Sequence, residues 1–267
     1  LAFVSRQDPD TGAKVTRLTP TDVTCHRTYF YQKCFTNDGH RLVFGAQFGE
    51  HWNYHLLDLQ AQTATQLSDQ AGENTFGGFL SPDDQYLYFV RAERQLIRLD
   101  IHTLQEDVVY QVPSDWVGYG TWVANSACTK MVGIEILATD WFALTDWKKF
   151  AEMFHSKPRC RLIRIDLQTG ERDVIHEENL WLGHPQYRPF DDGTVAFCHD
   201  VSDTHHFEHS AHWTARDDAS TFGSWNHHDV CSTVTTVHLV VNRAVFQSHF
   251  GHVATGFFHR FLDSSRH

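Results

Sequence analysis

The feature that most constrains the fold of this chain is an internal repeat with a spacing of about 44 residues. It appears in the stretches CFTNDGHRLVF (34–44), FLSPDDQYLYF (79–89), VANSACTKMVG (123–133) and YRPFDDGTVAF (187–197). In each stretch, polar turn residues come before a short run in which apolar and polar residues alternate. This alternation is typical of a half-buried strand, and the turn residues allow the tight bend that precedes it.

A second pattern follows the first three of these stretches. Each continues with a strand, an aspartate, a turn that contains Thr and another strand, and the aspartates are Asp58, Asp100 and Asp166. These segments predict hairpins, and 7–18 (QDPDTGAKVTRL) predicts the closing hairpin of an earlier unit. Four strands in about 40–45 residues are typical of a β-propeller blade. A β-sandwich is the alternative, but recurrence of the whole hairpin favours an all-β propeller with about four recognisable blades.

One insertion, at 134–158, interrupts the strand pattern. Within it, TDWKKFAEMFH (145–155) begins with Thr and Asp, which commonly cap the first turn of a helix. Its apolar residues recur at helical spacing. We therefore expect a short helical insertion near 141–155 that lies over one face of the propeller.

Charge and hydropathy exclude several classes of partner. The chain has 267 residues and a net charge of −11, which argues against nucleic acid because that partner requires clustered Lys and Arg. No apolar run reaches the roughly 18 residues of a membrane helix, and the first residues lack the pattern of a signal peptide. We therefore expect no membrane association. The six cysteines show no CxxC spacing, which favours reduced thiols and a cytoplasmic location. No pattern indicates an oligomeric state.

Four segments lead into the innermost strands of the predicted blades, at 24–33, 73–79, 117–122 and 181–189. In a propeller such segments reach the central channel. They are rich in His, Arg, Gly and aromatic residues. Aromatic rings offer flat faces to a sugar, and Arg binds a carboxylate through two hydrogen bonds. The segments therefore predict a site for an acidic sugar.

Side chains in these segments that are difficult to explain as core residues are the candidates for substrate binding. They are His26, Arg27, His184 and Arg188. Other side chains in the same segments are expected to pack neighbouring blades together, namely Phe76, Tyr119 and Trp122.

Long stretches of the chain resemble the oligogalacturonate lyases, a pectin-degrading polysaccharide lyase family. The resemblance covers about residues 7–200 and is carried by DPDTGAKVTRLTP, DVTCHRTYFYQKCFTNDG, NTFGGFLSPDD, DWVGYGTWVANSACTKMVGIEI, LTDWKKF and WLGHPQYRPFDDGTVAFCHD. It implies a seven-bladed β-propeller and the β-elimination of short galacturonate oligomers, which gives an unsaturated uronate. It also implies a divalent metal, manganese, bound by histidines and a Gln of the later blades.

The implied elimination removes a proton next to a carboxylate. A metal ion can offset the negative charge, a His can accept the proton, and an Arg can stabilise the charge that develops. The family's Q-x-x-H-x-H run of metal ligands has no match here, since QSHFGH (247–252) has the spacing Q-x-H-x-x-H. Catalytic residues and metal ligands are therefore not assigned.

The pattern changes abruptly after residue 200. We therefore divide the chain into a lyase-like partial propeller (1–200) and an unassigned tail (201–267) without family resemblance, which holds 11 of the 20 histidines and no Lys. The tail has three interpretations: a metal-binding extension, divergent blades, or a change of reading frame, which the abruptness favours. The histidines that suggest a metal are His205, His206, His209 and His212. CSTVTTVHLVVNRAVF (231–246) has the β-branched content of a strand pair.

Two classes of function are expected. The first is an oligogalacturonate lyase, weak or inactive if the tail is not family sequence, because an unclosed propeller exposes its edges. The second is a non-catalytic propeller fragment that binds acidic oligosaccharides or other proteins.

Overall fold

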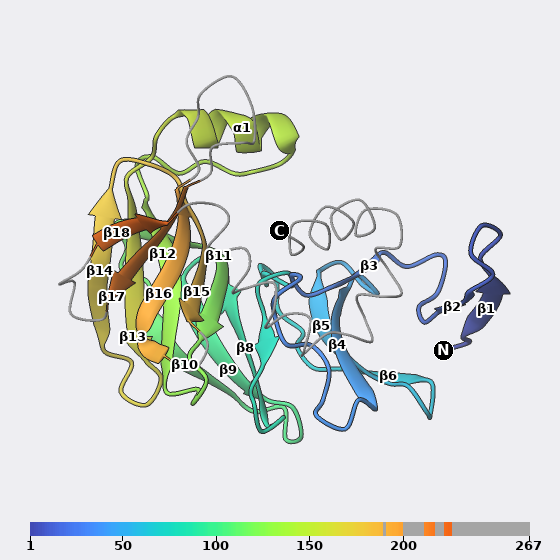
Figure 1. Cartoon of the computed structure of the whole chain (residues 1–267). Helices are drawn as coiled ribbons and strands as arrows, with labels where there is room; N and C mark the ends of the chain where they lie inside the picture. Colours follow the sequence, from blue (N-terminus) through green and yellow to red (C-terminus); the bar gives the residue numbers. More distant parts are fainter. Residues whose placement is uncertain (189–190, 200–210, 217–221, 226–267) are drawn as a thin grey trace, which may run out of the picture.

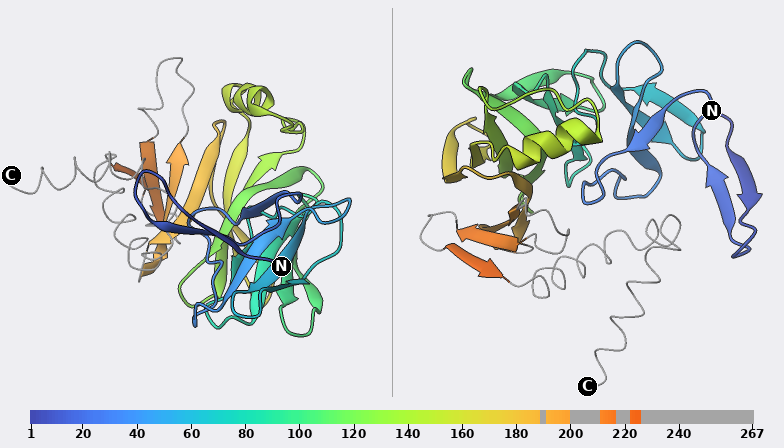
Figure 2. Two further views of the ribbon diagram at one scale, coloured as in Figure 1. Left: turned by 90° about the vertical axis from the view of Figure 1, so that its right-hand side faces the viewer. Right: turned by 90° about the horizontal axis from the view of Figure 1, so that it is seen from above.

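The computed structural model describes residues 1–188, 191–199, 211–216 and 222–225, which form four four-stranded antiparallel sheets and one two-stranded hairpin. The sheets stand side by side in chain order along an arc, as the views in Figures 1 and 2 show. We call them blades 1 to 4. This radial arrangement of four-stranded sheets is that of a β-propeller and not of a two-layer sandwich, so the predicted fold class is confirmed.

Each blade is a meander whose strands pair in chain order. Blade 1 contains β3 (Cys25–Arg27), β4 (Arg41–Ala46), β5 (Asn53–Asp58) and β6 (Thr63–Gln66). Blade 2 contains β7 (Phe79–Leu80), β8 (Tyr86–Arg91), β9 (Gln95–Asp100) and β10 (Glu106–Gln111). Blade 3 contains β11 (Trp116–Ala124), β12 (Lys130–Leu137), β13 (Cys160–Asp166) and β14 (Arg172–Glu178). Blade 4 contains β15 (Leu182–Arg188), β16 (Asp191–His199), β17 (Ala211–Arg216) and β18 (Phe222–Trp225).

The turns that open the first three repeated stretches each contain the same kind of hydrogen bond, from a backbone N–H group to a side-chain oxygen. The side-chain oxygens of Thr36, Ser81 and Asn125 accept from the backbone N–H five residues later, at 3.0, 2.9 and 2.9 Å. A side-chain acceptor in the turn satisfies a donor that the strand ladder leaves unpaired. The polar turn residues of the repeat therefore fix where the second strand begins in blades 1 to 3.

The marker aspartates close the hairpins at the outer edges of the blades. Asp58, Asp100 and Asp166 each accept from the backbone N–H groups two and three residues later, at 2.8–2.9 Å. These backbone donors hold the pKa of each carboxyl below its ordinary value. Asp8 accepts from Thr11 N at 2.9 Å in the same way, inside the hairpin of β1 (Val4–Gln7) and β2 (Lys14–Arg17). The predicted N-terminal hairpin is thus present.

The insertion contains the helix α1 (Trp147–His155), which confirms the predicted helical segment. Asp146 caps it, because the aspartate side chain accepts from Lys149 N at 2.9 Å. On the side that faces the blades, Met153 is fully buried and the ring of Phe150 lies 5.4 Å from that of Trp181. The helix therefore lies over the upper ends of blades 3 and 4 (Figure 1).

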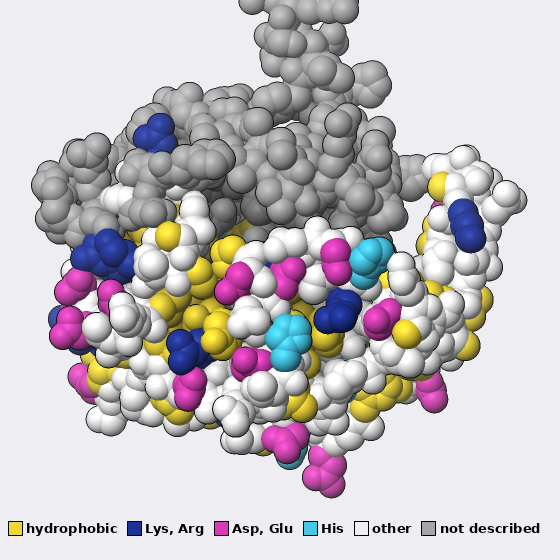
Figure 3. Space-filling model, turned by 90° about the horizontal axis from the view of Figure 1, so that it is seen from below, with side chains coloured by type: hydrophobic (Ala, Val, Ile, Leu, Met, Phe, Trp, Pro, Cys, Tyr) yellow, Lys and Arg dark blue, Asp and Glu magenta, His cyan; other side chains and the backbone are white. Residues whose placement is uncertain are grey.

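Neighbouring blades share layers of buried apolar side chains. Val43 and Tyr54 of blade 1 meet Leu87 and Phe89 of blade 2 in one such layer. Equivalent layers join blade 2 to blade 3 and blade 3 to blade 4. Figure 3 shows the lower face, where acidic, basic and histidine side chains are interspersed around apolar ones.

Buried ion pairs are also linked to the neighbouring blade by hydrogen bonds. Glu135 of β12 is fully buried, and its carboxylate accepts from Tyr110 Oη of blade 2 at 2.8 Å and from Arg161 Nε at 2.6 Å. Between blades 1 and 2, the Glu73 carboxylate pairs with Arg91 Nη2 at 3.0 Å and accepts from Asn53 Nδ2 at 3.2 Å. Each ion pair therefore carries one hydrogen bond, from Tyr110 or from Asn53, that forms only when the neighbouring blades are packed together.

Blade 4 contains chain from beyond residue 200. The strands β17 and β18 pair with β16 and with each other, whereas the sequence pattern indicated that the blade strands end near residue 200. The backbone of a strand supplies the ladder hydrogen bonds whatever its side chains are, so the loss of the repeat pattern did not prevent pairing. The division of the chain at residue 200 as a domain boundary stays a prediction.

Candidate functional site

The segment 28–33, which follows β3, runs across the inner ends of the other three blades. Tyr29 makes two of these contacts. Its backbone N–H donates to Phe76 O of blade 2 at 2.7 Å, and its hydroxyl lies 2.9 Å from His184 Nε2 of blade 4. The Tyr29 and His184 rings are stacked with their centroids 5.7 Å apart. One tyrosine of blade 1 therefore contacts both blade 2 and blade 4.

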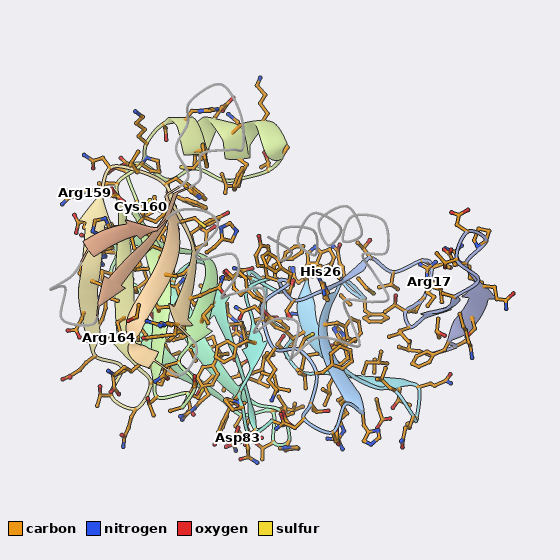
Figure 4. All side chains as sticks on the ribbon, in the orientation of Figure 1. Arg17, His26, Asp83, Arg159, Cys160 and Arg164 are labelled. Carbon is orange, nitrogen blue, oxygen red and sulfur yellow. The ribbon has the colours of Figure 1, made fainter. Side chains whose placement is uncertain are left out.

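Two more side chains of the same segment reach blade 3. Tyr31 forms a short hydrogen bond through its hydroxyl with Thr121 Oγ1. Gln32 donates from Nε2 to Gly77 O at 2.8 Å and to Trp122 O at 3.0 Å. The four segments that the sequence placed at the channel are thus held together by direct hydrogen bonds. We call this region the inner site. It lies toward the same end of the sheets as His26, opposite the turn that carries Asp83 (Figure 4).

His26 lies in the inner site with both ring nitrogens engaged. Nδ1 lies 2.9 Å from Arg27 O, so it donates to this carbonyl, and Nε2 lies 3.0 Å from Thr75 Oγ1 and accepts from it. Burial lowers the pKa of the ring, which favours this neutral form. Gly45, the cross-strand partner of His26, leaves the room that the ring needs, because a Cβ there would lie 2.6 Å from His26 Cε1.

Arg27 points away from His26. Successive side chains of a strand project to opposite faces, so Arg27 of β3 shares a face with Cys25 and not with His26. Within the described part of the chain, its half-buried guanidinium has no hydrogen bond or ion pair. The Arg27 guanidinium is therefore available to bind an anionic group, on the face of β3 opposite to His26.

His184 occupies an irregular position in β15. The register of β15 with β16 shifts between Gly183 and Gln186, and His184 has a φ of 51°. A positive φ is unfavourable for a residue with a Cβ, and β-bulges redirect side chains locally. The bulge turns the His184 ring toward Tyr29 in the inner site.

Arg188 lies at the other end of β15. It is exposed, and it lies four positions after His184, which corresponds to about 13 Å along a strand. The structure therefore brings His26 and His184 to the inner site through the segment 28–33, and places Arg27 and Arg188 elsewhere. The role of all four in substrate binding stays a prediction.

Of the aromatic residues that were expected to pack neighbouring blades together, Trp122 is buried but Phe76 is not. Trp122 is 2% exposed, whereas Phe76 is 54% exposed at the inner site. Phe30, in the segment that contacts Phe76, is 46% exposed. The pair Asn74–Thr75 and the glycines that follow Phe76 signalled a turn, and an aromatic ring at a turn is exposed more often than one inside a strand. These turn residues could therefore have identified Phe76 as an exposed residue.

The fully described side chains do not form a metal site. Among them, no three His, Cys, Asp or Glu residues lie together in a geometry that could bind a metal ion. The suggested ligands His205, His206 and His209 and the stretch 247–252 lie outside the described residues, and only the backbone of His212 is described. In the same described part, no helix is long and apolar enough to cross a membrane.

The neutral state of His26 makes the stability of the fold depend on pH. An unfolded chain binds a proton at His26 near pH 6.5, whereas the folded ring resists protonation, so stability falls as the pH drops below that value. We expect the His26→Gln variant to lose less free energy of unfolding than the wild type between about pH 7.5 and about pH 5.5. Urea unfolding at both pH values measures this. The exposed His51→Gln variant is the control, and equal losses in all three proteins would contradict the expectation.

Radial four-stranded sheets, with histidine and aromatic side chains gathered at their inner ends, define a protein of the β-propeller class. Among solved structures, the chain superposes with a TM-score of 0.78 and 60% identity on an oligogalacturonate lyase in complex with manganese, covering 84% of this chain and 59% of that one. An oligogalacturonate lyase from Vibrio parahaemolyticus gives a TM-score of 0.76 and 53% identity, covering 83% and 58%. TolB from Acinetobacter baumannii, at 13% identity and a TM-score of 0.51 over 80% of this chain and 45% of its own, shares the fold alone.

Comparison with curated sequences gives relatives of the same kind as the solved structures. The chain is 65% identical over 199 residues to the oligogalacturonate lyase of Dickeya dadantii, covering 74% of this chain and 51% of the relative. It is 64% identical over 200 residues to the oligogalacturonide lyase of Pectobacterium atrosepticum, covering 75% and 52%. The oligogalacturonate lyase family model matches residues 1–265. The chain therefore belongs to the oligogalacturonate lyase family.

The family model and the two sequence relatives match different lengths of the chain. The family model continues past residue 200, where the resemblance was expected to end, whereas the two sequence relatives match about three quarters of the chain. The chain spans about half the length of the curated relatives it matches.

Proposed function

We propose that this protein cleaves short galacturonate oligomers by β-elimination and releases an unsaturated uronate. The observation that carries the proposal is the 65% identity to an oligogalacturonate lyase over 199 residues, a span that includes most of the described structure. The inner site supports it, because aromatic faces and His side chains from three blades gather there. Such a surface suits a sugar ring.

The proposed cofactor is a divalent metal, manganese, as in the relative that was solved in complex with it. When bound, such an ion offsets the negative charge next to the carbon that loses its proton. The described blades do not themselves bring three metal-binding side chains together. We therefore assign to these blades the binding and orientation of the sugar.

The four candidate residues have different proposed parts in this task. His26 uses both ring nitrogens within the protein, which makes it a positioning residue and not the group that accepts the substrate proton. The Arg27 guanidinium has the chemistry to bind a uronate carboxylate through two hydrogen bonds. His184 and the exposed Arg188 complete the set of proposed substrate-binding residues.

Consumption of digalacturonate by the purified full chain tests the proposal. We expect digalacturonate to be consumed when manganese is added and to persist when a chelator is present. Saturable binding without any consumption would instead support a non-catalytic oligosaccharide-binding protein. A chain that neither consumes nor binds the sugar would contradict both functions. The same assay decides whether turnover is weak, as the incomplete repeat predicted.

A cytoplasmic location is also proposed. Five cysteines lie within the described residues, and none of these five forms a disulfide. Burial raises the pKa of the Cys34 and Cys160 thiols, which keeps them protonated and unreactive. Thiols of this kind are typical of proteins in a reducing compartment.

A further inference from the structure

The ring of Phe76 is exposed although the backbone that carries it is held firmly. Asn74 Oδ1 accepts from Gly77 N at 3.1 Å, and Asn74 Nδ2 donates to Gly120 O at 2.9 Å. The Phe76 carbonyl accepts from Tyr29 N at 2.7 Å. The turn 74–77 is therefore fixed to blades 1 and 3 on both sides. An exposed ring on such a turn loses little conformational entropy when a ligand binds it.

One face of the Phe76 ring is covered and the other is open. The His26 imidazole stacks on it with the ring centroids 3.7 Å apart and the planes 4° from parallel. The Trp52 ring also contacts the imidazole, with its centroid 4.7 Å from that of His26 and its plane tilted by 41°. Since Phe76 is still 54% exposed, the face away from His26 is accessible. The Phe76 and His26 rings therefore form a parallel pair, and the open face of Phe76 is an accessible aromatic surface.

This surface is continuous with the rest of the inner site. Phe30, which is 46% exposed, follows Tyr29, whose N–H binds the Phe76 carbonyl and whose hydroxyl binds His184. Single exposed apolar side chains are common on protein surfaces. Phe76 differs from these because its orientation is set by a parallel ring and its backbone is linked to the segment that joins all four blades.

We propose that Phe76, supported by His26, is a stacking platform for a galacturonate ring, in a subsite that binds the sugar without a metal ion. The proposal rests on the proposed function, which supplies the class of substrate. A galacto-configured pyranose presents a group of C–H bonds on one face, and that face packs on an aromatic ring while the hydroxyls and the carboxylate stay at the rim. No cluster of three metal-binding side chains lies among the fully described residues of the inner site.

Calorimetric titration of the full chain with digalacturonate, in the presence of a chelator, tests this proposal. We expect saturable binding by the wild type. We expect binding to be about tenfold weaker in the Phe76→Ala variant, the size of effect that loss of one aromatic stacking contact produces. The Phe76→Trp variant, which keeps a flat face, should bind within a few-fold of the wild type.

The matched control is Phe48→Ala. Phe48 is 45% exposed, and its ring contact is with His55, 4.9 Å away, and not with Phe76. Phe48→Ala should bind like the wild type, and thermal unfolding should show that both variants remain folded. Equal binding by the wild type and Phe76→Ala would overturn the proposal, as would binding that requires manganese.

These outcomes are separate from a failure of the proposed function. Metal-free binding that depends on Phe76, without consumption of digalacturonate when manganese is added, would support the platform and contradict the lyase. Consumption with manganese, but no effect of Phe76→Ala on binding, would support the lyase and contradict the platform.

Discussion

Replacing Glu135 with alanine is expected to lower the free energy of unfolding by about 3–5 kcal/mol, because it leaves a buried guanidinium without its counter-ion. The Glu135 side chain is 0% exposed and that of Arg161 is 8% exposed, with Arg161 Nη2 2.5 Å from Glu135 Oε2. The same carboxylate accepts from Tyr110 Oη of the neighbouring blade at 2.8 Å. The substitution therefore removes a contact within blade 3 and another between blades 2 and 3.

An exposed pair in the same blade provides the control. Asp173 pairs with Arg164 Nη2 at 2.6 Å, but its side chain is 68% exposed. Asp173→Ala should cost less than about 1 kcal/mol, since water screens such a pair. Urea unfolding of both variants measures the difference. Similar losses in the two proteins would show that the contacts of Glu135 do not hold blades 2 and 3 together.

The Gly78→Ala variant is expected to lose about 1–3 kcal/mol of stability through overpacking and to lose sugar binding as well. A Cβ at Gly78 would lie 2.1 Å from Tyr54 Oη, and Tyr54 is fully buried. Tyr54 Oη donates to Asn74 O at 2.7 Å, so moving this ring also moves the turn that carries Phe76. Stability and the geometry of the inner site are coupled at this glycine.

Thermal unfolding together with calorimetric titration of digalacturonate measures both effects. Gly49→Ala is the matched control, because a Cβ there meets nothing within 4 Å. It should unfold and bind like the wild type. A Gly78→Ala protein with unchanged stability would contradict the close approach of Tyr54, and a destabilised protein with unchanged binding would show that the turn does not depend on Tyr54.

Those parts of the fold that depend on local chemistry were predictable from the sequence. The aspartates at 58, 100 and 166 specify hairpins because a short acidic side chain can accept from backbone donors two and three residues later. The N-cap of α1 followed from the same kind of local preference, at Asp146. The structural role of a residue that acts within a single turn can therefore be recognised from the sequence.

Features that depend on distant parts of the chain were not predictable in this way. The position of Tyr29 between Phe76 and His184 results from the packing of blades that are up to 155 residues apart in sequence. The stacking of the Phe76 ring on His26 likewise joins side chains that are distant in sequence, which no local pattern specifies.

The central proposal is that this member of the oligogalacturonate lyase family cleaves galacturonate oligomers by elimination, and the mass of the products tests it most directly. Elimination adds no water, so digalacturonate should give one galacturonate and one unsaturated uronate that is lighter by one water and absorbs in the ultraviolet through its new double bond. Mass spectrometry of a reaction with added manganese should show this pair. Two molecules of galacturonate, which hydrolysis would give, or uncleaved digalacturonate would contradict the claim.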